Sequence, residues 1–355
     1  MSNLYNVDNM KLKKIFPLLG AALLLCSCEK VIDFDPGDIE PYVVMVARPQ
    51  ADSTVSVYLS YSRFFLNGAN TDNQIEDGAV TLEVNGVPTT GTYVETVNGS
   101  GRYLVNIRPQ AGDSLRLTAL VPGYDQLVTA ATRVPSSPQF EVTDFVIDTS
   151  ESTYYEWDST WHKDYVYFKI KMKMKGCSPK DCFSVSLLAS SFYTYNPDGT
   201  PSSEWDTAEN RMQLVNFTVN DPIVNTQTLE NVIDGYDGRF WGNQMTFSAE
   251  DFVDGEHEFT IEFNEYCGYE TFNKDFSKMP ILLKVRGLSW DLYLYDKTTS
   301  AQSELDEIFG EPVQVHSNIE GGIGIFGAMS DKKERLCNPR FEQFNHDGGY
   351  YYKKK

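Results

Sequence analysis

The stretch Val166-Tyr-Phe-Lys-Ile-Lys-Met-Lys-Met-Lys175 alternates apolar and mostly lysine side chains along its whole length. Neighbouring residues of a β-strand point to opposite faces of the sheet, so this alternation predicts a strand with one buried apolar row and one solvent-facing lysine row. A lysine row is typical of a solvated sheet face or a protected edge strand, although it also offers a site for an anionic ligand.

The same period of two recurs on the N-terminal side. It marks five short runs, near residues 43–45, 55–59, 80–84, 103–107 and 115–119. Turn signals such as Asn85-Gly86 and Asn98-Gly99 lie between these runs. Short strands with turns at this spacing are typical of an antiparallel sandwich. Residues 42–134 are therefore expected to form an immunoglobulin-like or fibronectin-like β-sandwich.

Pro135-Ser-Ser-Pro138 is stiff and polar, and we place a domain boundary there. A second β-rich domain is expected over residues 139–340. Its further strands are predicted near residues 140–147, 183–188, 212–219, 244–247, 258–263 and 281–288. The fold class predicted is mostly β, with two antiparallel β-sandwich-like domains.

One segment of the second domain has a helical period. Apolar residues recur at intervals of three and four from Ser289 to Phe309, before Gly310, which predicts one long amphipathic helix near 290–309. Residues 312–327 follow as strand, turn and strand, with glycines where a Cβ would obstruct a turn or a close approach. Residues 341–355 are expected to be a tail, frayed from Tyr350 on.

The N-terminus has the pattern of a lipoprotein signal. A lysine cluster precedes a short apolar run, Ile15–Leu25, which is far below the roughly 20 residues of a spanning helix. Leu25-Cys-Ser-Cys28 then places an aliphatic residue three positions before Cys28. We expect residues 1–27 to be removed, Cys28 to be lipidated and residues 28–41 to form an acidic tether. The alternative is an ordinary secretory signal with incidental cysteines.

Charge excludes one class of partner. Removal of residues 1–27 takes away three lysines and Asp8, which leaves 27 basic and 49 acidic residues and a formal net charge of −22. Binding to nucleic acid through phosphate neutralisation is therefore not expected. An acidic surface also disfavours docking on anionic lipid, so membrane attachment should depend on acyl chains at Cys28.

Four cysteines remain beyond the lipidation site, Cys177, Cys182, Cys267 and Cys337. An even number in a compartment that permits disulfides is compatible with two bridges. The turn sequence between Cys177 and Cys182 favours that pair, which leaves Cys267 with Cys337. The alternative is buried free thiols. A zinc site is disfavoured, because no Cys-x-x-Cys pair and no suitably spaced His is present.

Several segments together resemble a known family. They are Cys28-Glu-Lys-Val-Ile-Asp-Phe-Asp35, Gly112-Asp-Ser-Leu-Arg-Leu117 with Pro122-Gly-Tyr124 and Val134-Pro135, and above all Glu311-Pro-Val313 with Ser317-Asn-Ile-Glu-Gly-Gly-Ile-Gly-Ile-Phe-Gly327. They resemble the domain of unknown function 4249 family of Bacteroidetes lipoproteins over essentially the whole mature chain. Members are typically encoded beside TonB-dependent outer-membrane receptors. The resemblance thus implies an accessory role at such a transporter and brings no catalytic residues.

The acidic residues after Cys28, namely Glu29, Asp33 and Asp35, are also similar to signals that send such lipoproteins to the outer face of the outer membrane. The resemblance therefore implies an outer-membrane location that faces the cell exterior.

The sequence lacks the patterns of common catalytic sites. Gly99-Ser-Gly101 is too short for a nucleophile elbow and reads as a hairpin turn. The histidines His162, His257, His316 and His346 have no metal-ligand spacing, and neither a phosphate loop nor a dinucleotide fingerprint is present. We expect no catalytic residue, cofactor or metal. Asp234-Gly-Tyr-Asp-Gly238 is similar in residue type to a calcium loop, but turn chemistry explains it more simply.

Aromatic residues on predicted loops offer a binding surface. Rigid aromatic side chains gain contact area at small entropic cost, so the predicted binding residues are Trp157, Trp161, Tyr195 and Trp205. The alternative is that they cap the core.

The function expected is a non-catalytic outer-membrane surface lipoprotein that assists a TonB-dependent transporter in ligand capture. An adhesin or structural surface protein is the alternative, and a hydrolytic enzyme is a distant third. The sequence leaves the ligand open.

Overall fold

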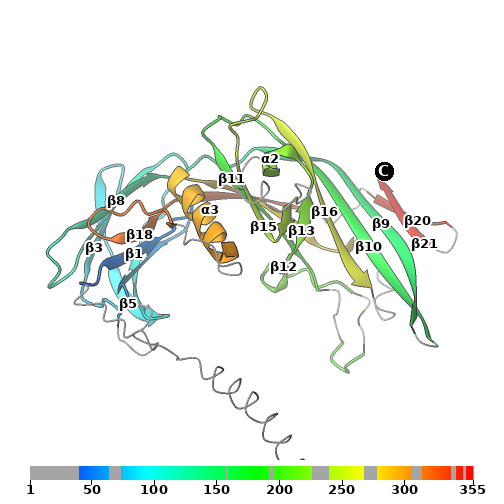
Figure 1. Ribbon diagram of the computed structural model, residues 1–355, viewed down its shortest axis with the longest axis horizontal. Coiled ribbons are helices and arrows are strands. Elements are labelled where there is room, and N and C mark those ends of the chain that lie inside the picture. The colour runs from blue at the N-terminus through cyan, green and yellow to red at the C-terminus, as the bar shows by residue number, and fades with distance from the viewer. Residues whose placement is uncertain are drawn as a thin grey trace, which may run out of the picture. The chain divides into compact units, whose positions relative to one another are not determined.

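The computed structural model describes residues 40–63, 73–156, 159–191, 196–200, 202, 204–225, 240–267, 278–305, 314–336, 341–346 and 349–354. Of residues 148–156, 159–165, 224–225, 265–267, 303–305, 341–346 and 349–354 it gives the backbone course alone. The predicted signal peptide, Cys28 and all but the end of the tether lie outside the described residues. The described chain is mostly β, as predicted (Figure 1).

Two sheets enclose the first core. They run in the orders β18-β1-β2-β6-β5 and β4-β3-β7-β8. Their strands are β1 (Val43–Ala47), β2 (Val55–Tyr61), β3 (Ala79–Val84), β4 (Val87–Thr90), β5 (Thr92–Val97), β6 (Ser100–Val105), β7 (Ser114–Leu120), β8 (Val128–Arg133) and β18 (Ile323–Phe326). The alternating residues singled out in the sequence, such as Val57, Leu82 and Leu117, are fully buried between these sheets. The five predicted runs are thus confirmed as strands.

The strand order of this sandwich depends partly on two hairpin turns. Asn85-Gly86 joins β3 to β4 and Asn98-Gly99 joins β5 to β6, and all four residues have positive φ. Paired positive φ values match the twist of two-residue hairpins, and Asn-Gly adopts them at low cost. The turn signals therefore had the structural role predicted for them.

The first sandwich is completed by a strand from near the other end of the chain. β18 pairs in parallel with β1, with Val44 opposite Ile323 and Val46 opposite Ile325. Nearby Phe326 and Ala328 are buried in the same core. The sequence placed residues 312–327 in the second domain as two strands. Within the described residues 314–327 the structure has one strand, and it pairs with the first sandwich.

Two further sheets enclose a second core. One, which we call the platform sheet, has the order β14-β13-β16-β10-β9, and the other has the order β12-β11-β17-β19 with β15 paired to β11. Their strands are β9 (Phe140–Glu156), β10 (Ser159–Met174), β11 (Cys182–Ala189), β12 (Gln213–Val215), β13 (Phe217–Val219), β14 (Phe240–Gly242), β15 (Gln244–Ser248), β16 (His257–Cys267), β17 (Ile281–Leu288) and β19 (Met329–Arg335). A 3₁₀ turn (Glu209–Arg211) and the short helix α2 (Pro222–Asn225) lie between strands.

The lysine-rich stretch forms the second half of β10. Its apolar residues from Val166 to Met174 are at most 2% exposed and pack against Phe263 of β16 and Phe183 of β11 within one cluster. The alternation is confirmed. Because β9 and β16 flank β10 on both sides, however, the lysine row does not protect an edge strand.

The aromatic loop expected after residue 147 is instead a pair of strands. β9 and β10 stay in antiparallel register to their tips, where Trp161 lies opposite Tyr154 and Ser159 opposite Glu156. Residues 148–153 are all polar and Tyr154 and Tyr155 are adjacent, so the sequence has no apolar alternation here. Backbone pairing continues the hairpin nonetheless.

α3 (Trp290–Leu305) is the predicted amphipathic helix, and residues 306–309 of the expected range lie outside the described chain. Leu292 and Tyr293 are buried in a third cluster together with Ile325 of β18, Leu288 of β17 and Met329 of β19. The helix lies beside β18 (Figure 1). It therefore joins strands of the two sandwiches. No helix in the described part of the chain is long and apolar enough to cross a membrane.

The end of the chain departs from the expected frayed tail. β20 (Phe341–His346) and β21 (Gly349–Lys354) pair as antiparallel strands, and β21 lies near β9. Tyrosines and phenylalanines in these strands favour extended backbone, and pairing outweighed the polar, terminal character of the segment.

Candidate functional site

The outer face of the platform sheet carries one row of side chains across four strands. Thr218 of β13 pairs with Trp241 of β14 on one side and with Glu262 of β16 on the other. Glu262 pairs in turn with Lys169 of β10. Residues opposite one another in paired strands point to the same face of the sheet. The residues next to them along the strands, such as Phe217, Phe263 and Phe168, point to the other face and belong to the core. The register thus aligns one aromatic, one hydroxyl and two charged groups on the outside.

A second row lies beside the first. Tyr167, two residues before Lys169 in β10, pairs with Asn264, two residues after Glu262 in β16. Asn216 directly precedes β13. The two rows line a depression of about 160 Å³. We call these seven outward side chains the platform: Trp241, Thr218, Glu262, Lys169, Tyr167, Asn264 and Asn216.

The platform offers both a flat apolar surface and hydrogen-bonding groups. The Trp241 side chain is 69% exposed, although its neighbour Phe240 packs against the core. Lys169 Nζ lies 2.9 Å from Glu262 Oε1, so the two charges offset each other. Thr218 Oγ1 donates to the backbone oxygen of Glu262 at 3.2 Å. This arrangement can hold a ligand by stacking and hydrogen bonding without a net charge.

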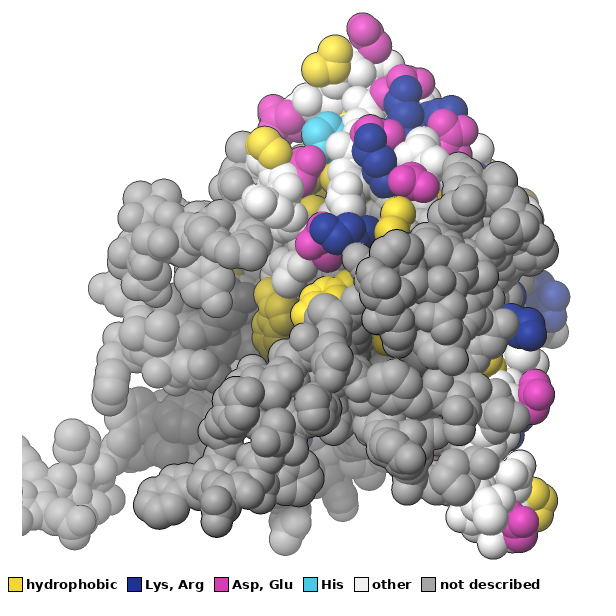
Figure 2. Space-filling view, turned by 90° about the vertical axis from the view of Figure 1, so that its right-hand side faces the viewer, with side chains coloured by type: hydrophobic (Ala, Val, Ile, Leu, Met, Phe, Trp, Pro, Cys, Tyr) yellow, Lys and Arg dark blue, Asp and Glu magenta, His cyan; other side chains and the backbone are white. Residues whose placement is uncertain are grey.

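Three ion pairs continue along this face, and we call them the ladder: Lys171 with Glu258, Lys173 with Glu256 and Lys175 with Glu141. A hydrogen bond from Lys171 lowers the pKa of Glu258, and one from Lys173 lowers the pKa of Glu256. The solvated-face interpretation of the lysine row thus fits, because the row is matched by glutamates. Figure 2 shows one side of the molecule on which basic and acidic side chains lie next to one another.

The two histidines whose side chains the structure describes, His257 and His316, are held in structural contacts. His257 Nε2 lies 2.9 Å from Asp221 Oδ1, and its ring stacks on Phe252 with centroids 5.2 Å apart. Asp221 Oδ1 also accepts the backbone N–H of Ile223, at the start of α2. This explains Asp221 as a helix cap. Asp234 and Asp237 of the calcium-like loop lie outside the described residues.

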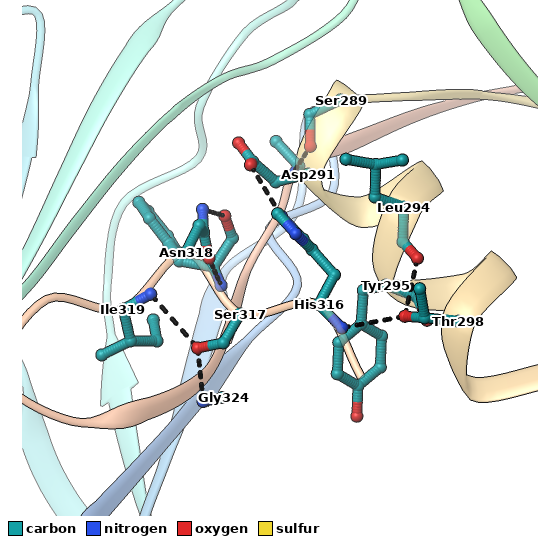
Figure 3. Close-up of polar contacts among 12 residues, drawn as sticks. Ser289, Asp291, Leu294, Tyr295, Thr298, His316, Ser317, Asn318, Ile319 and Gly324 are labelled. Carbon is teal, nitrogen blue, oxygen red and sulfur yellow. Dashed lines mark hydrogen bonds and ion pairs between the residues drawn. The ribbon is translucent and has the colours of Figure 1, made fainter. Parts of the chain in front are cut away.

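His316 belongs to a polar seam between α3 and the segment before β18 (Figure 3). Its Nε2 lies 3.0 Å from Asp291 Oδ1, and its backbone N–H donates to Thr298 Oγ1 at 2.9 Å. Ser317 Oγ accepts the backbone N–H groups of Ile319 and Gly324. The His316 ring thus contacts a carboxylate of α3 while the Ser317 hydroxyl holds backbone N–H groups, so the two side chains have separate structural contacts.

We call residues 317–327, which carry the strongest resemblance to the family, the glycine junction. A Cβ on Gly324, which has φ +126°, would lie 2.2 Å from the Met45 carbonyl oxygen, and one on Gly327 would lie 2.6 Å from Leu292 Cβ. Asn318 bonds both backbone groups of Phe326 at 2.9 Å. The prediction that these glycines permit close approach is confirmed.

The predicted aromatic site is described at one residue alone. Trp157 and Tyr195 lie outside the described residues, and of Trp161 the structure gives only the backbone. Trp205 is partly buried and packs against the second core, which favours the core-capping alternative for that residue. Trp241 was missed in the sequence. Its signal was Phe240-Trp241 within a strand, because adjacent aromatics in a strand face opposite sides.

Cys177 and Cys182 are free thiols, so the predicted bridge between them is wrong. Cys182 is buried in the cluster around α3, whereas Cys177 packs against the second core. The two cysteines lie at the ends of one turn, but their side chains pack into different clusters. Burial, with a smaller contribution from Asp181, raises the pKa of Cys177 to about 11 and of Cys182 to about 12. Cys337 and the Cys267 side chain lie outside the described residues.

A metal site finds no support in the residues described: no three His, Cys, Asp or Glu side chains are grouped closely enough to hold an ion.

Comparison with known proteins gives a family and little else. No curated protein matches the sequence. A crystal structure of Parabacteroides merdae β-glucuronidase with glycerol in its active site is similar at 12% identity, over 70% of this chain and 23% of that enzyme, with a TM-score of 0.22. The chain thus spans under a quarter of that enzyme, and so distant a likeness bears on neither fold nor activity. The sequence matches the family described as Domain of unknown function (DUF4249) over residues 29–335. This protein belongs to the DUF4249 family.

Proposed function

We propose that this protein is a non-catalytic, lipid-anchored outer-membrane lipoprotein that helps a TonB-dependent transporter to capture its ligand at the cell surface. The observation that carries the capture role is the platform, where an exposed indole stands beside amide and hydroxyl groups in a depression. Its partner and location are supported by the family resemblance and by the lipoprotein signal ending at Cys28.

The chemistry of the platform supports binding without turnover. Lys169 Nζ and Glu262 Oε1 lie 2.9 Å apart, so the two groups are engaged with each other. A general acid or base must instead reach the proton that it transfers to or from the substrate. The two described His–Asp pairs, at His257 and His316, do not line the depression.

The anchor is tested by a single substitution. Cys28→Ala should release the protein from the membrane fraction, because an acidic surface provides no electrostatic attachment to anionic lipid. Fractionation and mass spectrometry of the mature N-terminus are the measurements. An unmodified N-terminus at another residue, with the Cys28→Ala protein still membrane-bound, would reject the anchor.

The partner is tested by affinity purification of the tagged full-length chain from outer membranes solubilised in mild detergent. A TonB-dependent receptor should be recovered with it in a defined ratio. Recovery of the chain without a receptor, as a polymer of itself, would instead support an adhesin or structural surface protein.

A further inference from the structure

We infer that the platform binds a neutral oligosaccharide, with one sugar ring stacked on the indole of Trp241. This inference rests on the proposed capture function and names the class of ligand. Sugars combine an apolar ring face with a rim of hydroxyl groups. A site for them needs an exposed aromatic face next to polar side chains that both donate and accept hydrogen bonds.

The aromatic face is Trp241. A single exposed apolar residue needs no explanation by itself. Here, however, the indole borders a depression, and the Trp241 backbone is held in β14 in register with Thr218. A rigid strand position loses little entropy on binding, so the ring is prepared for stacking.

The polar groups around the indole are of the required type. Asn216 and Asn264 each carry an amide that donates and accepts, and both side chains are exposed. Glu262 adds acceptors and Lys169 adds donors at the same depression. These groups come from β10, from β16 and from the residue before β13, so several parts of the sheet contribute to the depression.

Charge argues for a neutral ligand. Lys169 is matched by Glu262, and the ladder next to it consists of further matched pairs. An anionic ligand would also meet the field of a chain with a formal net charge of −20. A cationic ligand finds no excess of carboxylates on the platform, where Glu262 is the one acidic side chain among the lining residues.

Size argues for one unit of a longer ligand. The depression of about 160 Å³ is smaller than the roughly 300–1,000 Å³ of pockets that enclose a drug-sized molecule or cofactor. An open, shallow site of this kind can hold one ring while the rest of an oligomer extends along the sheet. An extended peptide adds to a sheet edge through backbone hydrogen bonds, whereas this depression is lined by side chains on the face of the sheet, next to its edge strand β14.

The test is calorimetric titration of the full-length chain, in a zwitterionic detergent whose headgroup is not a sugar, with maltohexaose, cellohexaose, xylohexaose and mannohexaose. Oligogalacturonate and a neutral extended peptide are the comparison ligands. At least one neutral oligosaccharide should bind and change the tryptophan fluorescence. Trp241→Ala should weaken that binding about tenfold or more, as expected of a central aromatic contact, and Trp241→Phe should weaken it less.

Trp290→Ala is the matched control, since Trp290 is also a half-exposed tryptophan (53%) but lies on α3 outside the platform. It should leave saccharide affinity unchanged. The inference is overturned if no neutral oligosaccharide binds at millimolar concentration, if oligogalacturonate or the peptide binds in preference, or if Trp241→Ala and Trp290→Ala have equal effects.

The ligand class and the proposed transporter role are tested by different measurements, so either one can be wrong while the other holds. If saccharide binding follows Trp241 but no receptor copurifies, the ligand class stands and the transporter role does not. If the receptor copurifies with wild-type chain and with Trp241→Ala alike while no oligosaccharide binds, the ligand class alone is wrong.

Discussion

The glycine junction and the platform differ in which part of the chain makes the contacts. At the junction, backbone atoms of Gly324 approach the Met45 carbonyl so closely that a methyl group has no room. On the platform, side chains such as Trp241 and Asn264 reach into solvent from strands that pair with their neighbours in the sheet. The most specific part of the sequence therefore maintains the fold, while the part available for binding has no sequence motif.

The largest expected effect is at the junction. Gly324→Ala should lower the free energy of unfolding by about 3 kcal/mol or more, because it adds a clash with Met45 to the strain of a positive φ. Gly86→Ala is the control, since Gly86 also has positive φ (+83°) but nothing lies within 4 Å of its added Cβ. Its cost should be limited to about 1–2 kcal/mol of backbone strain. Denaturant unfolding measures both, and equal costs would show that the close approach is not a constraint.

The glycine junction could be predicted from the sequence only in part. The glycines at residues 321–327 indicated close approach, but the neighbour could not be named, because β18 pairs with β1 across some 280 residues. Local patterns report which face of a strand is buried and not which distant strand it meets. For the same reason the sequence assigned this segment to the second domain.

The platform was harder to predict. Its members lie on four strands, and they become neighbours only through the registers of β14, β13, β16 and β10. β14 has three residues, too few for a period. By contrast the Val166–Met174 alternation is long and strict, so its buried face was predicted correctly. The strands at 154–161 were missed because backbone pairing there has no apolar alternation.

A second prediction compares ion pairs that differ in burial. Asp331 of β19 is 7% exposed, with Lys284 Nζ and Arg286 Nε each at 2.9 Å. Burial raises the pKa of Asp331, but hydrogen bonds from Arg286 and Lys284 together outweigh it and the net pKa is lowered. Asp331→Asn should reduce the free energy of unfolding by about 3 kcal/mol, at the low end for a broken buried pair because both cations are partly exposed.

Thermal or denaturant unfolding at neutral pH is the measurement for Asp331→Asn, with Glu258→Gln on the exposed ladder as its control. The Lys284→Met, Arg286→Met, Asp331→Leu triple variant should recover most of the lost stability, since it removes the charges together. A loss in Asp331→Asn no greater than in Glu258→Gln would show that burial does not distinguish the two sets of pairs.

The smallest effect is expected on the ladder, and its pH dependence identifies its origin. The lowered pKa of Glu258 means that its ion pair with Lys171 stabilises the fold above the ordinary carboxyl pKa of 4.5 and that this contribution is lost as pH falls through the lower, folded-state pKa. Both side chains are over a third exposed, so solvent screening keeps the contribution small.

Glu258→Gln should therefore lower Tm by about 2 °C or less at pH 7 and low salt. The difference from wild type should shrink at high salt and vanish in acid, where wild-type Glu258 is also neutral. A difference that persists unchanged in acid would instead point to the hydrogen bond from Thr143 to Glu258, which does not require the charge of Lys171.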